Sequence, residues 1–269
     1  MTDIDGLNEK YDALKACFAG LGSAAVAFSG GVDSTLLLKA AADALGDRAA
    51  AVTAHSAVFP QRELDEAADF CERRRIRQFI FRYDIKNVPH FEENGNRRCY
   101  FCKKYILEQV FRIARENGLR YVAEGSHADD EGVYRPGAEA VAELGAVSPL
   151  KLAGFTKNDI RALSKALGLP TYDKQSFACL ATRVPYGDRI TDEKLERIGF
   201  AEQYLLGLGL RRLRVRCHGN LARIETDEEG YALLADRGRR EGAYAALREA
   251  GFTYTAVDLL GYRTGSMDE

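Results

Sequence analysis

Two cysteines separated by two residues, Cys99 and Cys102, stand in the stretch NRRCYFCKKY at residues 96–105. This spacing occurs nowhere else in the chain. A thiolate pair of this kind can form half of a tetrahedral zinc site, a redox dithiol or part of an iron–sulfur centre. Cys217 and His218 are the residues that could complete a zinc site. The pair alone leaves these three chemistries open.

The stretch FSGGVDST at residues 28–35 could bind an anion, because it lies between an apolar run and a helical pattern. Gly30 and Gly31 let the backbone approach an anion closely, and consecutive amides at a helix N-terminus favour phosphate. A Walker A loop is excluded, since the spacing differs and the lysine is missing. The alternative is a simple glycine turn capped by Asp33 and Ser34.

The first 170 residues alternate between strand-like and helix-like segments. Apolar runs predict strands at residues 23–28, 48–56, 77–84 and 119–126. Amphipathic patterns predict helices at residues 33–45, 60–75, 100–118 and 156–170. Strands that alternate with helices predict an α/β fold with a doubly wound parallel sheet. Such sheets bind ligands at the carboxyl ends of their strands, where the stretch at residues 28–35 falls.

The C-terminal third has a different pattern. A helix is predicted at residues 191–209, followed by strands at 211–219 and 221–227, a charged helix and a strand at 252–261. This β-β-α-β order predicts a smaller α+β domain. We therefore expect one domain at residues 1–188 and a substrate or oligomerisation domain at residues 189–269.

Composition restricts the partners and the location. The 269 residues carry a net charge of −2, so there is no global basic field and nucleic acid is not a predicted partner. The apolar runs are too short for a membrane span, and the acidic N-terminus does not resemble a signal peptide. A cytoplasmic location is expected, where six cysteines indicate thiols or metal ligands rather than disulfides.

The segment SGGVDS at residues 29–34 resembles the SGGxDS signature of the PP-loop ATP pyrophosphatases, which have the adenine nucleotide alpha hydrolase-like fold. EGSHADD at residues 124–130 is similar to the segment that follows the fourth strand in that family. The resemblance implies ATP bound by its pyrophosphate end, cleavage between the α and β phosphates, and Mg²⁺ held with help from Asp33. The implied nucleotide-binding residues are Ser29, Gly30, Gly31, Asp33, Ser34, Gly125 and Asp129.

Four further segments resemble one branch of this superfamily, the LarE sulfur transferases of nickel-pincer nucleotide (lactate racemase cofactor) biosynthesis. They are YRPGAEA at 134–140, SFACLATRVPYG at 176–187, RVRCHGNLARIE at 214–225 and DLLGYRTGSM at 258–267. The resemblance implies that the substrate is pyridinium-3,5-biscarboxylic acid mononucleotide. Its carboxylates would be adenylylated and converted to thiocarboxylates. Self-association into a homo-oligomer is implied as well.

Two versions of the family's sulfur chemistry are known. In one, a lone cysteine gives up its own sulfur and becomes dehydroalanine; in the other, three cysteines hold a [4Fe–4S] cluster whose open iron carries an extra sulfide. The presence of Cys99, Cys102 and Cys179 favours the cluster version, and a sacrificial Cys179 is the alternative. The neighbouring cations, expected to lower the thiolate pKa, are Arg97, Arg98, Lys103 and Lys104. The remaining cysteines, expected in the core, are Cys17, Cys71 and Cys217.

A phosphorylated dicarboxylate substrate calls for arginines that bind pairs of oxygen atoms. The predicted substrate-binding residues are Arg183, Arg189, Arg214 and Arg216, with Tyr134, Arg135 and Glu225 as weaker candidates. Arg214 and Arg216 share one face of a strand, although a solvated sheet face would give the same pattern. The rival functions are a PP-loop tRNA thiolase and a nucleotide-binding regulator with a degenerate site.

Overall fold

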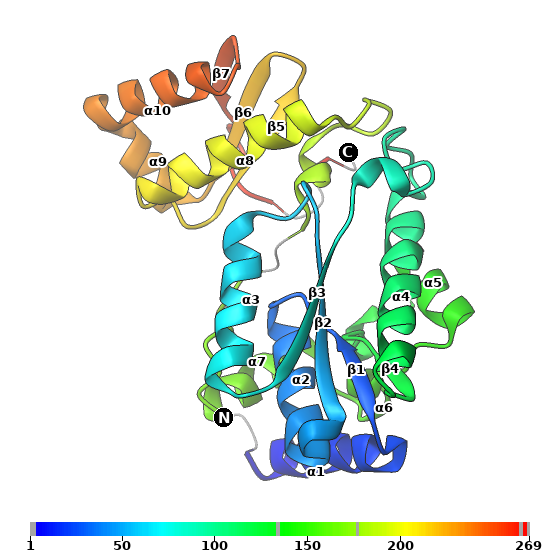
Figure 1. The fold of residues 1–269 in the computed structure, drawn as a ribbon. Coiled ribbons are helices and arrows are strands. Elements are labelled where there is room, and N and C mark those ends of the chain that lie inside the picture. Colours follow the sequence, from blue (N-terminus) through cyan, green and yellow to red (C-terminus); the bar gives the residue numbers. More distant parts are fainter. Residues whose placement is uncertain (1–3, 133–134, 176–177, 264–265, 268–269) are drawn as a thin grey trace. The chain divides into compact units, whose positions relative to one another are not determined.

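The computed structural model describes residues 4–132, 135–175, 178–263 and 266–267 (Figure 1). The chain divides into two compact units, each considered by itself. The first unit comprises Met1–Ser56, Gln61–Pro89 and Arg97–Phe177, and the second comprises Ala57–Pro60, His90–Asn96 and Ala178–Glu269. Two short segments from the first hundred residues therefore belong with the C-terminal unit. The domain boundary expected at residue 188 stays a prediction.

The first unit is built on a four-stranded parallel sheet in the order β3-β2-β1-β4. The strands are β1 (Ala24–Ala27), β2 (Ala49–His55), β3 (Arg77–Arg82) and β4 (Tyr121–Ala123). β1 pairs in parallel with β2 on one side and with β4 on the other. The strand order thus reverses at β1, which is the point where open α/β sheets bind ligands. The predicted parallel α/β architecture is confirmed.

Helices cover both faces of this sheet (Figure 1). Ala24 and Val26 of β1 pack into the core of one face, and Ala25 packs into the core of the other. The first face is covered by α1 (Ile4–Leu21), α2 (Val32–Leu45), α3 (Gln61–Arg73) and α7 (Lys157–Ala166). The second is covered by α4 (Arg98–Glu116) and α5 (Pro136–Leu144), and α6 (Pro149–Leu152) is a short helix before α7. The sheet is therefore doubly wound, as expected.

Local sequence explains the main helix boundaries. Thr156 is the N-cap of α7, and it forms a reciprocal capping box with Asp159. Helix α1 was not among the predicted elements. Its buried side chains Leu7, Leu14 and Phe18 recur at helical spacing, and this pattern could have revealed it.

The second unit contains a three-stranded sheet in the order β5-β6-β7. β5 (Leu213–His218) and β6 (Leu221–Thr226) form an antiparallel hairpin, and β6 pairs in parallel with β7 (Tyr254–Val257). The helices are α8 (Asp192–Gly207), α9 (Glu228–Ala235) and α10 (Arg237–Glu249). The single charged helix expected after β6 is two helices, because Asp236 ends α9 and caps α10 by accepting from the Arg239 amide at 2.9 Å. In the part of the chain that the structure describes, no helix is long and apolar enough to span a membrane.

Candidate functional site

The loop between β1 and α2 has the geometry of an anion-binding turn. Gly31 is the N-cap of α2 in extended backbone, and no side chain of a described residue caps it. The backbone amides of the first turn of α2 can therefore donate to an anion bound at this loop. Ser34 Oγ donates to the Gly31 carbonyl at 3.2 Å and lies 3.1 Å from Ser29 Oγ. The hydroxyl groups of Ser29 and Ser34 thus lie beside the first amides of α2.

Two glycines bring backbone segments close together at this loop. Gly30 has φ +71°, and a Cβ there would lie 3.3 Å from Ala67 Cβ of α3. A Cβ on Gly125, in the loop after β4, would lie 3.4 Å from Asp33 Cβ and 3.5 Å from the Ser34 amide nitrogen. The loops after β1 and β4 therefore meet at the switch point, so the structure brings these predicted nucleotide-binding residues together.

Lys157, the first residue of α7, binds both predicted acidic residues. Its ammonium group lies 2.7 and 2.6 Å from the two carboxylate oxygens of Asp33. Its backbone amide donates to Asp129 at 2.7 Å. Both carboxylates are oxygen ligands of the kind that Mg²⁺ prefers, and both keep solvent-exposed surface, so they fit the predicted metal. Sequence reasoning missed Lys157, although its place beside a capped helix start was a usable signal.

Glu124, at the end of β4, is a second residue that the sequence interpretation did not single out. Its carboxylate is buried and accepts from Ser148 Oγ at 2.6 Å, from the Ser126 amide at 3.0 Å and from Lys103 Nζ at 3.2 Å. Burial raises the pKa of Glu124, but Lys103 and the two serines outweigh it and hold the pKa below its usual value. Since Lys103 directly follows Cys102, this contact joins the cysteine helix to the loop after β4.

The CxxC pair occupies the first turns of α4. Cys99 is exposed and Cys102 half-buried, and residues three apart lie on the same side of a helix. The Tyr83 hydroxyl lies 3.8 Å from the Cys102 sulfur. A helix N-terminus stabilises thiolates, and thiolates are the soft ligands that iron–sulfur clusters use. The donor chemistry of this turn therefore fits the predicted cluster.

Three of the four predicted cations around the CxxC pair have acidic partners. Arg97 pairs with Glu139 at 2.8 Å, and Lys104 pairs with Glu143 at 2.5 Å. Lys103 binds Glu124, as described above, and the fourth cation, Arg98, is buried. Their field on the two sulfur atoms is therefore weaker than that of unpaired cations.

Of the three cysteines expected in the core, Cys71 and Cys217 are buried, whereas Cys17 of α1 is only partly buried. Burial raises the pKa of the Cys71 thiol to about 12. Burial also raises the pKa of Cys217, with Arg197 and Lys194 opposing it. The Cys217 thiol donates to the Gly219 carbonyl at 3.5 Å, and the Nε2 atom of His218 accepts from Arg223 at 3.2 Å. Both residues of the alternative zinc site therefore have hydrogen-bond partners within the protein.

Cys179 lies in the second unit, at the start of a short 3₁₀ turn (Leu180–Arg183). Cys179 is partly exposed. Its backbone carbonyl accepts from the Thr182 amide at 3.0 Å and from Thr182 Oγ1 at 2.9 Å. Leu180 donates to the Val58 carbonyl at 2.9 Å. The backbone of this loop is therefore held tightly around a partly accessible thiol.

Arg183 is buried and paired with an acid, neither of which was predicted from the sequence. Its side chain is 0% exposed, and its guanidinium binds the Glu202 carboxylate at 2.9 and 3.1 Å. It also donates to the Cys179 carbonyl at 3.1 Å and the Ala178 carbonyl at 2.6 Å. With these partners the guanidinium supports the cysteine loop. Direct contact with substrate, the role predicted for Arg183, stays untested.

Arg214 and Arg216 lie on one face of β5 and are 6% and 5% exposed, so the solvated-face alternative does not hold for them. Arg216 binds Glu225 at 2.8 Å, and Glu225 also accepts from Ser266 Oγ at 2.6 Å. Burial, followed by the neighbouring Arg183 charge, lowers the pKa of Arg214. These buried arginines and acids form an arginine cluster that consists of Arg183, Arg214, Arg216, Glu202 and Glu225.

The remaining predicted substrate-binding residues that the structure describes have partners outside the arginine cluster. Arg189 is exposed and pairs with Glu92 at 2.9 Å. Arg135 pairs with Asp130 at 2.5 Å. Tyr134, like Ser176 and Phe177 of the third cysteine segment, lies outside the described residues.

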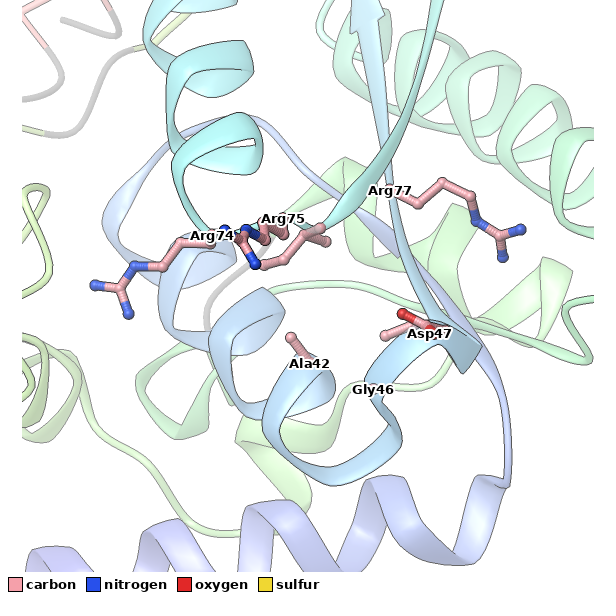
Figure 2. Close-up of a pocket in the computed structure, with 8 residues that line it drawn as sticks. Ala42, Gly46, Asp47, Arg74, Arg75 and Arg77 are labelled. Atoms are coloured by element: carbon pink, nitrogen blue, oxygen red, sulfur yellow. The ribbon is translucent and has the colours of Figure 1, made fainter.

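A separate pocket of about 390 Å³ lies at the amino ends of β2 and β3, opposite in strand direction to the phosphate loop. Arg74, Arg75 and Arg77 line it together with Asp47. Figure 2 shows Arg74 and Arg77 pointing away from each other rather than toward a common centre. This pocket lacks the converging donors that an anion site needs.

Among the described residues, no group of three or more His, Cys, Asp or Glu side chains is arranged to hold a metal ion. Cys99 and Cys102 belong to the first unit and Cys179 to the second. The three-cysteine ligand set therefore stays a prediction.

Comparison with known proteins supports the family assignment, although no protein-family model matches the chain. The pyridinium-3,5-bisthiocarboxylic acid mononucleotide synthase of Lactiplantibacillus plantarum is 37% identical over 267 residues, which cover 98% of this chain and 95% of that protein. An uncharacterized protein of Synechocystis sp. is 38% identical over 262 residues, covering 97% and 98%. A subunit of the glutamine-hydrolyzing GMP synthase of Thermoplasma volcanium is 29% identical over 194 residues, covering 65% and 60%. With a PP-loop at the switch point of its parallel sheet, the chain belongs to the LarE family of pyridinium-3,5-bisthiocarboxylic acid mononucleotide synthases.

Proposed function

We propose that this enzyme is an ATP-dependent sulfur transferase acting on pyridinium-3,5-biscarboxylic acid mononucleotide. The observation that carries the proposal is the phosphate loop at residues 29–34, whose open amides lie beside Asp33, Lys157 and Gly125. The product class follows from the name of the relative in Lactiplantibacillus plantarum. The proposal thus joins an anion-binding turn to the thiocarboxylate product that the relative's name gives.

The first half-reaction activates a carboxylate. A substrate carboxylate oxygen attacks the α phosphorus of ATP, an oxygen–phosphorus bond forms, and the bond to the bridging α–β oxygen breaks to release pyrophosphate. The loop amides would hold the leaving pyrophosphate, Asp33 and Asp129 would hold Mg²⁺, which supplies positive charge to the phosphates when bound, and Lys157 would donate to a phosphate oxygen. Positioning and preorganised electrostatics supply most of the rate enhancement in such a step.

The second half-reaction introduces sulfur. A sulfur nucleophile attacks the acyl carbon, and AMP leaves with the carboxylate oxygen. Cys99, Cys102 and Cys179 would hold a [4Fe–4S] cluster, which supplies sulfur in a soft, nucleophilic form when it is bound. The alternative is that Cys179 gives up its own sulfur and becomes dehydroalanine.

Arginines would bind the anionic groups of the substrate. Arg189, Arg214 and Arg216 would bind its phosphate and carboxylates. Arg183 would act mainly by holding the Cys179 loop. Self-association and a cytoplasmic location remain predictions.

Release of pyrophosphate that requires both ATP and the dicarboxylate mononucleotide tests the first half-reaction. Mass spectrometry of the nucleotide product should then detect thiocarboxylates. A chain that binds ATP but releases no pyrophosphate with this substrate would favour a regulator over an enzyme.

Anaerobic purification with iron and sulfide analysis tests the sulfur source. We expect iron and sulfide in the wild type and their loss in Cys99→Ala, Cys102→Ala and Cys179→Ala. Mass spectrometry of the protein after turnover provides the opposing result: a Cys179 that has lost its sulfur would contradict the cluster as donor.

A further inference from the structure

Lys174, in the segment after α7, contacts the phosphate loop directly. Its Nζ donates to the Gly30 carbonyl at 3.2 Å and pairs with Glu66 at 2.6 Å and with Glu63 at 2.8 Å. The lysine side chain is 16% exposed. Both glutamates belong to α3, so Lys174 connects the loop to that helix.

Gly30 is the residue of the loop that most needs such support. Its φ of +71° lies in the left-handed region, and glycine has the greatest backbone freedom of all residues. The same helix α3 lies against it, since a Cβ on Gly30 would be 3.5 Å from the Glu63 carbonyl oxygen. Packing on α3 limits where Gly30 lies, and the Lys174 bond limits how its carbonyl is turned.

The orientation of this carbonyl determines the orientation of an amide in the anion site. The Gly30 carbonyl and the Gly31 amide belong to one rigid, planar peptide unit, in which C=O and N–H point in opposite directions. With the carbonyl held on Lys174, the Gly31 N–H is directed to the other side of the peptide unit. Gly31 is the N-cap of α2, and its N–H donates to Ser29 Oγ over a long distance of 3.4 Å. A stronger acceptor such as a phosphate oxygen would compete well for this donor.

The lysine segment is itself anchored on α7. Arg161 donates to the Lys174 carbonyl at 2.9 Å and to the Tyr172 carbonyl at 2.9 Å. Helix α7 also carries Lys157, which binds Asp33. One helix thus supports the phosphate loop at its glycine and at its aspartate.

We propose that Lys174 is a positioning residue for the phosphates of ATP, acting through the Gly30 carbonyl to preorganise the Gly31 amide. Its own charge is neutralised by Glu63 and Glu66, so its effect on the phosphates is exerted through the backbone. This inference rests on the proposed function, because it assigns a role within the same nucleotide site.

Calorimetric binding of pyrophosphate and of AMP to the full-length protein tests this role. In Lys174→Met we expect the Kd for pyrophosphate to rise about tenfold or more, as for loss of a charge-assisted hydrogen bond, with AMP affinity within about twofold of wild type. Lys39→Met is the matched control, since Lys39 is 19% exposed and pairs with Asp43 on α2. It should leave both affinities unchanged.

A second variant separates positioning from charge. Lys174→Met leaves Glu66 uncompensated, whereas Lys174→Met/Glu66→Gln keeps the net charge of the wild type. The loss of pyrophosphate affinity should persist in this double variant and at high salt, and Lys174→Arg should restore part of it. Wild-type affinity in the double variant, or a loss that disappears with salt, would overturn the positioning role.

The two levels of the proposal fail differently. If the wild type binds neither ATP nor pyrophosphate, the proposed function itself is wrong. If the wild type binds both and the charge-balanced double variant binds equally well, only the role of Lys174 is wrong. Should Lys174→Met not fold, Lys174→Gln decides, because its shorter side chain does not reach the Gly30 carbonyl; an unchanged Kd for pyrophosphate in Lys174→Gln would contradict the inference.

Discussion

The phosphate loop and the arginine cluster both present hydrogen-bond donors, but they are made from different parts of the chain. The loop uses backbone amides of adjacent residues, with Gly30 and Gly31 at its centre. The cluster uses guanidinium groups that are almost fully buried, and buried cations are stable only beside matched acids. Glu202 and Glu225 provide this match. A main-chain site therefore depends on local geometry, whereas a side-chain site depends on long-range partners.

The largest effect is expected from breaking the cluster at Arg183. Arg183→Met leaves the buried Glu202 carboxylate uncompensated, so the free energy of unfolding should fall by about 3–5 kcal/mol in chemical denaturation. Arg183→Met/Glu202→Gln should recover part of the loss, because the glutamine can still accept from the Val215 amide. A loss below about 1 kcal/mol in the single variant would contradict the structural role of Arg183.

A substitution in the phosphate loop should lower enzyme activity more than it lowers the free energy of unfolding. Gly30→Ala adds a Cβ at φ +71° against Ala67, and we expect pyrophosphate release to fall about 10²–10³-fold as an amide donor is displaced. Gly145→Ala is the control, since Gly145 has φ +72° and open space around it. Equal loss of activity in both variants would mean that backbone strain, rather than the anion site, is responsible.

Substitution of Glu124 tests whether a single buried carboxylate in the first unit stabilises the fold as the carboxylates of the arginine cluster do. Its pKa is lowered from 4.5, so its ionised form stabilises the fold above that pH, and the stabilisation is lost as the pH falls through the lowered value. Glu124→Gln should cost about 1–3 kcal/mol at neutral pH. Unfolding curves of the two proteins, measured from neutral to acid pH, should converge at low pH; a constant difference would refute the assignment.

The smallest change in stability is expected at Arg189. Its ion pair with Glu92 is exposed, so Arg189→Gln should change the free energy of unfolding by less than about 1 kcal/mol. Substrate affinity should nevertheless fall about tenfold if the guanidinium binds a carboxylate. The exposed Arg211 gives a control, and an equal affinity loss in Arg211→Gln would point to a general charge effect.

The same contrast explains what could be predicted from the sequence. The strands and their parallel order follow from local patterns, and the nucleotide-binding role of the loops with Gly30 and Gly125 was inferred from the family resemblance. The burial of Arg214 and Arg216 could not be predicted, since alternation on a strand shows which residues share a face but not what covers it. Lys157 and Lys174 were missed because their partners lie 124 and 144 residues away in the sequence.

Two errors of element definition have local causes. The charged stretch after β6 has the pattern of one helix, although Asp236 is a good N-cap and divides it. Helix α1 was overlooked because the polar residues between Leu7, Leu14 and Phe18 obscured their helical spacing, although that spacing is present in the sequence.

The pairing of Arg183 with Glu202 also has a consequence for biosynthesis. Glu202 is translated 19 residues after Arg183, and it accepts from Val215 on β5 as well as from the arginine. A nascent chain that has reached Arg183 therefore has the thiol and the arginine but not the carboxylate that pairs with the arginine. The native contacts of Arg183 can form only after Glu202 of α8 has been synthesised, and a chain that ends before Glu202 would lack them.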